Sequence, residues 1–293
     1  MKLDNRNNGD MLRLGLPKGR MQEAVITLLA DAAIRVKPSA RGYRPTISLR
    51  ACEAKILKPQ NIVEMLELGT RDVGFAGADW VEEMRADVVE LLDTGLDPVQ
   101  VVVAAPPALL RDNELPDRRL VVASEYVRIT RAWIESRGLD AEFVRSYGAT
   151  EVFPPEDADV IVDNMATGST LRANDLKTVD VLMSSSTRLY ASPGAMADPL
   201  KRGRIEDLQL LLESVLEARR RVMFEVNAPT DRLDAVVAIL PCMREATVSP
   251  LFGNSGFAVK AAVPKELLPE LIPAVKAAGG TDVVVTSLTQ IVP

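Results

Sequence analysis

The chain has 293 residues, more than one small hydrophobic core can use, and this length predicts two or three domains. Its formal net charge of −6 argues against nucleic acid as the main partner. It contains no histidine, which excludes a Ser-His-Asp triad, a Cys-His pair and an HExxH zinc site. Any chemistry must therefore rest on carboxylates, lysine and arginine, hydroxyl groups, backbone dipoles or an oxygen-ligated metal ion.

The cytoplasm is the expected location. Cys52 and Cys242 are the only cysteines, too few for a disulfide framework or a metal-binding set. Residues 1–10 are polar and are expected to form a disordered lead-in rather than a signal peptide. No apolar segment is long enough to span a bilayer, so no membrane partner is expected.

In chain order, strands and helices alternate over the first two thirds of the sequence, which predicts parallel α/β sheets. The first unit is expected to contain strands over 12–16, 72–76 and 99–105 and helices over 21–33, 61–68 and 80–84. A second unit begins near Pro106, with strands over 120–123 and 141–144 and a helix over 126–136. Residues 182–190 are expected to cross back to the first unit, before a long helix over 205–222.

The last part of the chain differs, because it follows the order β-α-β-β-α-β of a ferredoxin-like module. The expected strands are 221–226, 246–248, 256–263 and 282–285, and the expected helices are 231–240 and 267–278. Modules of this type often bind amino acids and pair through their sheets, although a fold alone does not specify a function.

The stretch from Asp159 to Leu171 carries the strongest functional signal. A buried strand ends at Asp163, and a loop rich in small hydroxyl-bearing residues then leads into a helix. A helix N-terminus leaves backbone N–H groups unpaired and favours a negative group, so this loop predicts a cradle for a phosphate monoester. Asp163 stands beside the cradle, where it can hold a sugar hydroxyl or a magnesium ion. The alternative interpretation is an ordinary helix cap.

Five further residues are candidates, each with a simpler alternative. Lys18 and Arg20 lie in a strand-to-helix turn, where they can meet a phosphate or form a solvated basic turn. Asp79 follows a strand end whose glycines a tight turn would also explain. Lys58 precedes a helix and could be a surface lysine. Glu151 could support magnesium or a ribose hydroxyl, or simply be solvated.

Four motifs together resemble one family. They are Leu14-Gly-Leu-Pro-Lys-Gly-Arg20, Asp72-Val-Gly-Phe-Ala-Gly-Ala-Asp79, Val162-Asp-Asn-Met-Ala-Thr-Gly-Ser-Thr-Leu171 and Ala246-Thr-Val-Ser-Pro250. Their order and spacing resemble ATP phosphoribosyltransferase, the enzyme that opens histidine biosynthesis, in its long form with a regulatory C-terminal domain. The resemblance covers residues 11–293; the phosphate loop is its most specific element and the glycine-aspartate turn its least specific.

The resemblance implies an α/β protein with two lobes like those of periplasmic binding proteins and an active site in the cleft between them. It also implies a C-terminal ferredoxin-like, ACT-like regulatory domain and a chain that crosses between the lobes twice. The expected limits are 11–105 and 187–212 for lobe I, 106–186 for lobe II with the phosphate loop, and 217–293 for the regulatory domain.

The implied reaction transfers the 5-phosphoribosyl group of 5-phosphoribosyl 1-pyrophosphate to N1 of ATP and releases pyrophosphate. The implied catalytic residues are Asp163, Glu151 and Lys18. The implied substrate-binding residues are Arg20, Lys58, Asp79, Thr167, Gly168, Ser169, Thr170 and Leu171. Mg²⁺ is the expected cofactor, held mainly by the pyrophosphate rather than by protein ligands. Histidine is the expected inhibitor, at Thr247 and Ser249, and the chain is expected to assemble with copies of itself, from dimer to hexamer.

Several positions depart from the family pattern. Lys58, Asn61 and Val63 stand in a segment that in the family usually reads Arg-Pro-x-Asp-Ile-Pro, and a lysine does not reproduce a bidentate arginine contact. Ala166 replaces a common Ser or Thr, and Asn164 replaces an aliphatic residue. These departures leave Asp163 and the Thr-Gly-Ser-Thr loop intact.

Three other functions stay open from the sequence. The lobes could form a cytoplasmic solute-binding or sensor protein, which predicts tight binding without turnover. The chain could be a non-catalytic regulatory paralogue, for which the altered segment 58–63 is the only support. A phosphoribosyltransferase with a different acceptor is the nearest enzymatic alternative.

Overall fold

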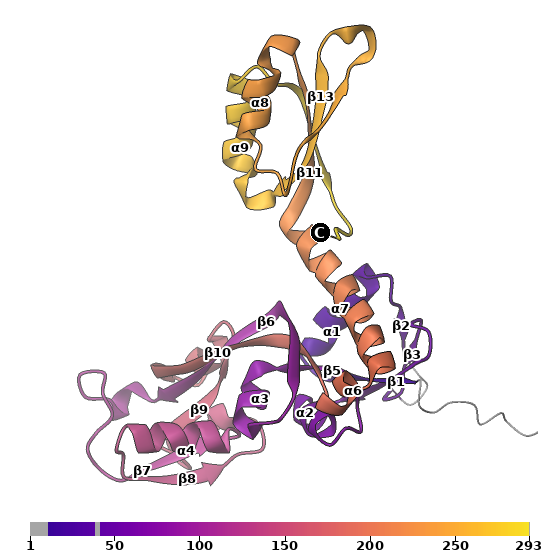
Figure 1. Cartoon of the computed structure of the whole chain (residues 1–293). Coiled ribbons are helices and arrows are strands. Elements are labelled where there is room, and N and C mark those ends of the chain that lie inside the picture. Colours follow the sequence, from indigo (N-terminus) through magenta and orange to yellow (C-terminus); the bar gives the residue numbers. More distant parts are fainter. Residues whose placement is uncertain (1–10, 39–41, 293) are drawn as a thin grey trace, which may run out of the picture. The chain divides into compact units, whose positions relative to one another are not determined.

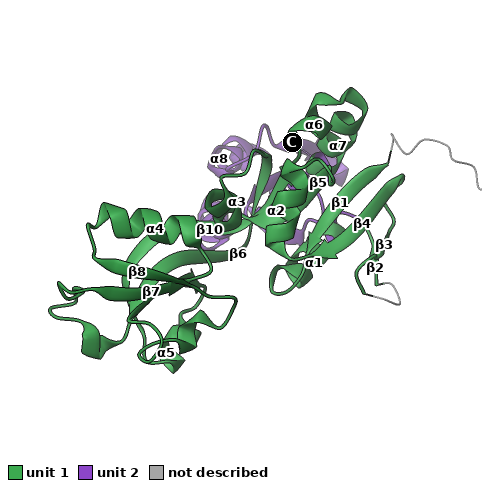
Figure 2. Cartoon of the chain, turned by 90° about the horizontal axis from the view of Figure 1, so that it is seen from below, with its two compact units in different colours: residues 1–30, 34–209 green, residues 31–33, 210–293 purple. Residues whose placement is uncertain are grey.

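A computed structural model describes residues 11–38 and 42–292, so the predicted lead-in over 1–10 lies outside the described residues. The chain divides into two compact units, coloured in Figure 2: unit 1 holds residues 1–30 and 34–209, and unit 2 holds residues 31–33 and 210–293. No helix in the described ranges is long and apolar enough to cross a membrane.

Unit 1 is built on one large sheet. Its strands are β1 (Leu12–Pro17), β4 (Cys52–Leu57), β5 (Val73–Gly77), β6 (Val89–Ala105), β7 (Leu120–Ser124), β8 (Ala141–Arg145), β9 (Val160–Met165) and β10 (Lys177–Ala191). They lie in the order β4-β1-β5-β10-β6-β9-β7-β8, and Figure 1 labels each of them except β4. Its helices are α1 (Met21–Asp31), α2 (Pro59–Glu67), α3 (Ala78–Met84), α4 (Val127–Ser136), α5 (Ser169–Ala173), α6 (Pro193–Ala197) and the first part of α7 (Pro199–Arg220). A separate small sheet pairs β2 (Val36–Lys37) with β3 (Thr46–Ile47).

Two long strands at the centre of this sheet belong to both of its halves. β6 and β10 pair with each other antiparallel, while residues 187–191 of β10 also pair with β5 and residues 100–104 of β6 pair with β9. The chain thus passes twice between two α/β lobes, lobe I around β4-β1-β5 and lobe II around β9-β7-β8. Pairs within each lobe's flank are parallel, as predicted. The central pairs are antiparallel, which was not predicted, because β6 leaves lobe I and β10 returns to it in the opposite direction. The finer lobe limits stay predictions, since both strands continue through both lobes.

A helix of lobe I completes the start of a helix of lobe II. The N-terminus of α4 has no side-chain cap of its own. Instead the buried Glu83 carboxylate, on α3, accepts the backbone N–H groups of Arg128 and Ile129 at 2.9 and 3.0 Å. Orphan N–H groups at a helix start need such partners, so α3 and α4 are joined by polar as well as apolar contacts.

A buried carboxylate holds α7 against lobe I. Asp72 is 1% exposed and accepts hydrogen bonds from Arg13 Nη2 at 2.7 Å and from Lys201 Nζ at 2.9 Å. Burial raises the pKa of Asp72, but the hydrogen bonds from Arg13 and Lys201 outweigh it and hold that pKa below its ordinary value. The carboxylate is therefore charged in the folded protein and links β1 to α7.

Replacing this carboxylate is expected to destabilise the fold. Asp72→Asn should lower the free energy of unfolding by about 2 kcal/mol at neutral pH, because an amide cannot accept from two cations equally well. Since the folded pKa lies below the unfolded one, the contribution is present above the unfolded pKa and is lost as the pH falls through the folded value. Urea unfolding should therefore show the gap between wild type and variant shrinking below about pH 4. The matched control is Glu142→Gln, in an exposed ion pair with Arg119. Equal losses in both variants would contradict the prediction.

Unit 2 has the ferredoxin-like fold that the sequence predicted. Its elements are β11 (Arg221–Ala228), α8 (Leu233–Ile239), β12 (Thr247–Pro250), β13 (Phe257–Pro264), α9 (Leu268–Ala277) and β14 (Thr281–Ser287). The strand order is β12-β13-β11-β14, all antiparallel. Val222, Phe224 and Val226 alternate along β11 and form a core with residues of both helices, so one face of the sheet is covered.

Candidate substrate site

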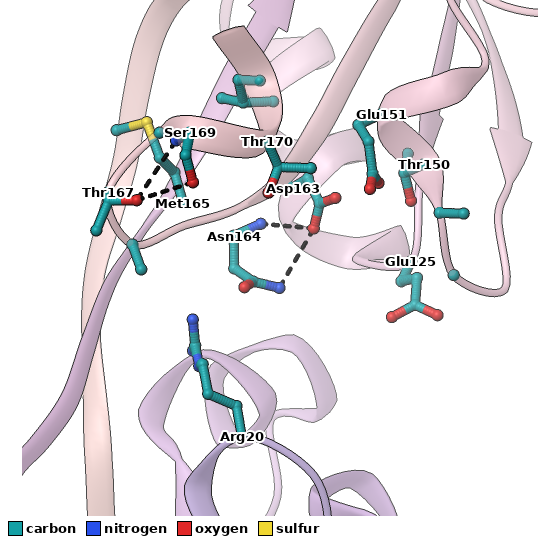
Figure 3. Close-up of a pocket in the computed structure, with 15 residues that line it drawn as sticks. Arg20, Glu125, Thr150, Glu151, Asp163, Asn164, Met165, Thr167, Ser169 and Thr170 are labelled. Carbon is teal, nitrogen blue, oxygen red and sulfur yellow. Dashed lines mark hydrogen bonds between the residues drawn. The ribbon is translucent and has the colours of Figure 1, made fainter. Parts of the chain in front are cut away.

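A cavity of about 340 Å³ in unit 1 lies where β9 ends and α5 begins. Strand ends and helix starts are the usual ligand positions in α/β sheets. Eight of the predicted site residues line this cavity: Arg20, Glu151, Asp163, Thr167, Gly168, Ser169, Thr170 and Leu171. Figure 3 shows Arg20 pointing into the cavity from the turn after β1, across from the β9–α5 loop.

The loop between β9 and α5 places hydroxyl groups and the start of a helix at the cavity. Gly168 is the N-cap of α5 with φ of 70°, a left-handed conformation that glycine adopts without strain, and the backbone N–H of Ser169 donates to the Thr167 hydroxyl at 3.4 Å. The Thr167 hydroxyl lies 3.0 Å from that of Ser169. Hydroxyls and unpaired N–H groups around a glycine can therefore bind an anion with three or four oxygens.

Three carboxylates share the cavity with this loop. Burial raises the pKa of Asp163 to about 6; the backbone N–H of Asn164, 2.7 Å away, opposes this, and the charges of Glu151 and Glu125 add to it. Glu151 comes from the short helix η2 (Thr150–Val152), and Glu125 follows β7. At a pH near this pKa of about 6, part of the Asp163 carboxyl groups carry a proton, so Asp163 can both accept hydrogen bonds from the hydroxyl groups of a sugar and donate to them.

The neighbouring charge offers a direct test of this electrostatic arrangement. Glu125→Gln removes one negative charge that faces Asp163, so the pKa of Asp163 should fall below about 6. The carboxyl ¹³C chemical shift of Asp163, identified by its loss in Asp163→Asn, would follow the titration. Glu142→Gln, in an exposed ion pair with Arg119, is the control and should leave the midpoint in place. An unchanged midpoint in Glu125→Gln would show that the charge of Glu125 does not contribute to this pKa.

The structure places three of the predicted residues outside the cavity lining. Lys18 donates to the Tyr43 hydroxyl at 3.0 Å and lies over its ring. Lys58 is the N-cap of α2. Asp79 is 5% exposed, and its carboxylate accepts hydrogen bonds from Tyr126 at 2.5 Å and Ser185 at 2.7 Å. A direct contact of any of these three with a substrate stays a prediction.

Some lining residues were not predicted. Glu125 directly follows the strand β7, and the criterion that selected Asp163 after β9 would have selected it as well. Thr150 and Asn164 also line the cavity. Thr150 is held from inside, because its hydroxyl lies 2.7 Å from that of Ser146, and both are buried. The residues around Thr150 in the sequence carry no signal that it would line a cavity.

Unit 2 contains a second cavity, of about 310 Å³. Its lining includes Thr247 together with the charged residues Arg244, Glu245 and Lys260. Ser249 is not part of the lining, although it lies two residues further along β12. The predicted pair of regulatory residues is thus divided between a cavity and a strand end.

The fold and the first cavity define a class: a two-lobed α/β protein with a hydroxyl-lined loop at its cavity and a C-terminal ferredoxin-like domain. Residues 58–214 match the family model described as ATP phosphoribosyltransferase, and residues 218–290 match the one described as HisG, C-terminal domain. The chain belongs to the ATP phosphoribosyltransferase family.

Individual relatives agree with this assignment. The chain is 37% identical to an ATP phosphoribosyltransferase of Pelotomaculum thermopropionicum, over 96% of this chain and 99% of that one. It is 38% identical to one of Chlorobium phaeovibrioides, over 93% of this chain and 95% of that one. Among solved structures, the ATP phosphoribosyl transferase (HisG:HisZ) complex of Thermotoga maritima matches with a TM-score of 0.63 at 24% identity, covering 71% of this chain and 99% of that one. This last likeness concerns the fold alone.

Proposed function

We propose that the chain transfers the 5-phosphoribosyl group of 5-phosphoribosyl 1-pyrophosphate to N1 of ATP, releasing pyrophosphate, in the cytoplasm and as the first step of histidine biosynthesis. Membership of the family supports the type of reaction. The observation that carries the proposal is one cavity that joins the loop Thr167–Leu171 to Asp163, with Arg20 opposite. A pentose 5-phosphate needs an anion cradle beside a group that holds sugar hydroxyls, and this cavity offers both.

In the proposed reaction the bond between C1 of the ribose and the pyrophosphate oxygen breaks, and its electron pair leaves with the pyrophosphate. The adenine N1 of ATP supplies the electron pair of the new bond. Because the leaving group is good, the protein needs to position the reactants and neutralise charge more than it needs a strong base. The loop Thr167–Leu171 would hold the 5-phosphate, Asp163 and Glu151 the ribose hydroxyls, and Arg20 with Lys18 and Lys58 the phosphates of ATP or pyrophosphate.

A divalent cation, expected to be Mg²⁺, fits the site through the substrate. Across residues 11–38 and 42–292 no group of three or more Asp, Glu or Cys side chains is arranged to hold a metal ion. Pyrophosphate oxygens are ligands that Mg²⁺ prefers, and the ion would neutralise the charge on the leaving group. Arg20 would then share that neutralisation from the protein side.

The test of the proposal follows near-ultraviolet absorbance, which should rise when adenine is substituted at N1. Protein, ATP, 5-phosphoribosyl 1-pyrophosphate, Mg²⁺ and pyrophosphatase are mixed, and free nucleobases replace ATP in parallel. A rise in absorbance with ATP as the acceptor, and with none of the free nucleobases, supports the proposal. A reaction only with another base would indicate a different phosphoribosyltransferase. Tight binding without turnover would indicate a solute-binding protein or a regulatory paralogue.

We further propose that histidine inhibits the enzyme from unit 2 and that the chain forms homo-oligomers, from dimer to hexamer. Support comes from the cavity beside β12, whose lining carries both signs of charge, as the ammonium and carboxylate of an amino acid require. An inhibitor must favour one global state over another, and assembly of several copies supplies such states. Thr247 and Ser249 are the proposed contacts.

A variant of the cavity wall tests the regulatory proposal. Thr247→Val should raise the histidine concentration for half-inhibition about tenfold, because it removes a hydroxyl that an amino acid would otherwise bond. Turnover without histidine should stay within about twofold of wild type. Thr230→Val changes an exposed threonine of the same unit and serves as the control. Undiminished inhibition in Thr247→Val would place the histidine site elsewhere.

A further inference from the structure

The Asp163 carboxylate is connected, through the exposed side chain of Asn164, to a network of hydrogen bonds whose inner members are buried. Asn164 donates from Nδ2 to Asp163 Oδ1 at 3.2 Å and to the Tyr126 hydroxyl at 3.3 Å. Tyr126 donates to Asp79 Oδ2 at 2.5 Å. Ser185 donates to Asp79 Oδ1 at 2.7 Å and accepts from the Asp79 backbone N–H at 3.0 Å. This network of hydrogen bonds therefore runs from β10 and α3, through the residue before α4, to the end of β9.

Burial fixes the direction of the inner hydrogen bonds of this network. Asp79 and Ser185 are each 5% exposed and Tyr126 is 1% exposed. Burial and the Asp79 carboxylate hold the pKa of Tyr126 well above its ordinary value, so the phenol stays protonated and donates a hydrogen bond to Asp79. The Tyr126 oxygen is then left as an acceptor, and only the amino side of the Asn164 amide can satisfy it.

The orientation of this amide decides what Asp163 meets. The Nδ2 group of Asn164 has two N–H donors, and one goes to Tyr126 while the other goes to Asp163. Were the amide turned over, its carbonyl oxygen would face the carboxylate and repel it. The Tyr126 ring is itself held by stacking on Trp80, with ring centroids 4.8 Å apart. The other charged groups that face the cavity near Asp163 are Glu151, Glu125 and Arg20.

We propose that Tyr126 and Asn164 are positioning residues: Tyr126 orients the Asn164 amide, which in turn holds the Asp163 carboxylate toward the sugar hydroxyls of a pentose 5-phosphate. The identity of this ligand rests on the proposed function, whereas the hydrogen-bond chain does not. Asp79 then acts at a distance from the substrate, as the anchor that keeps Tyr126 in place.

The experiment compares Tyr126→Phe, Asn164→Leu and the double variant with wild type. Each single variant should lower kcat about tenfold and leave KM for ATP within about twofold, since a hydrogen bond to a charged group is lost at the ribose side only. Calorimetry should show ribose 5-phosphate binding weakened by about tenfold. The double variant should be no worse than the poorer single one, because each link needs the other. Additive losses would overturn the proposal.

Tyr190→Phe is the matched control, since Tyr190 is another tyrosine of unit 1 that is 2% exposed. If both single variants behave like this control while wild type transfers to ATP, the inference fails and the proposed function stands. If wild type binds ribose 5-phosphate and the variants weaken it non-additively, but no transfer to ATP occurs, the inference stands and the proposed function fails. Should Asn164→Leu not fold, Tyr126→Phe decides alone, because it keeps the ring and its stack on Trp80.

Discussion

Asp163→Asn is expected to lower kcat/KM for 5-phosphoribosyl 1-pyrophosphate about 10³-fold, the largest effect we expect from a single substitution in this chain. The proposed role of Asp163 needs a negative group that binds the ribose hydroxyls more strongly as positive charge develops at C1. An amide of the same shape keeps the packing and loses that charge. Steady-state kinetics with either substrate varied would measure the loss.

The fold should tolerate this substitution. The pKa of Asp163 is raised to about 6, so the folded protein disfavours its charge and gains nothing from it in stability. Urea unfolding should therefore place Asp163→Asn within about 1 kcal/mol of wild type. Asp175→Asn is the control, since Asp175 lies at a φ of 52° that asparagine also adopts, outside the cavity lining. Equal kinetics for the two variants would remove Asp163 from the mechanism.

Gly168→Ala should raise KM for 5-phosphoribosyl 1-pyrophosphate by about 10- to 100-fold, because a shift of about 1 Å in a binding loop is enough for such a loss. A Cβ at this position would lie 3.0 Å from Arg172 Nη1 and 3.2 Å from Met165 Sδ, at a φ of 70°. Alanine is strained at this φ, and the strain together with these two contacts is expected to shift the loop that lines the cavity. Affinity for ATP should change little.

The matched control for this variant is Gly138→Ala. Gly138 has a φ of 62° and open space around its Cβ position, so alanine there costs the same backbone strain, about 1 kcal/mol, without touching the cavity. Both variants should lose similar stability in thermal unfolding, and only Gly168→Ala should lose affinity. Similar KM values in the two variants would mean that the loop does not bind the phosphate.

The β9–α5 loop and its place at the cavity were predictable because all of its parts are neighbours in sequence. The strand, the carboxylate, the glycine and the helix start fall between residues 160 and 173, and their chemistry is local. Glu125 was equally within reach, since it too ends a strand. The role of Asp79 was not, because it depends on Tyr126 and on Ser185, which is 106 residues away in sequence. A sequence shows which residue has a carboxylate but not whether a distant hydroxyl already occupies it.

The strands show the same limit. β6 runs from Val89 to Ala105, although only 99–105 was predicted. Its first half contains Gly95 and Asp97, both with positive φ, and together with Thr94 and Pro98 they interrupt the alternation that identifies a strand. That half is a strand because β10 pairs with it, and pairing partners cannot be read from one segment. β4 was missed as well, even though its side chains alternate in burial. Ala54 and Ile56 are buried, whereas their neighbours in the strand are half-buried or exposed.

The hydrogen bonds between Glu83 and the start of α4 have a consequence for any attempt to divide the protein into fragments. A fragment that begins after β6 would contain α4 but not the carboxylate that accepts the N–H groups of Arg128 and Ile129. Tyr126, directly before α4, would lose Asp79 in the same cut. Lobe II by itself would therefore lack two hydrogen-bond partners that lobe I supplies, the carboxylates of Glu83 and Asp79. Dissection or domain exchange at this boundary should therefore leave the N-terminus of α4 without its hydrogen-bond partners, and the helix should fray there.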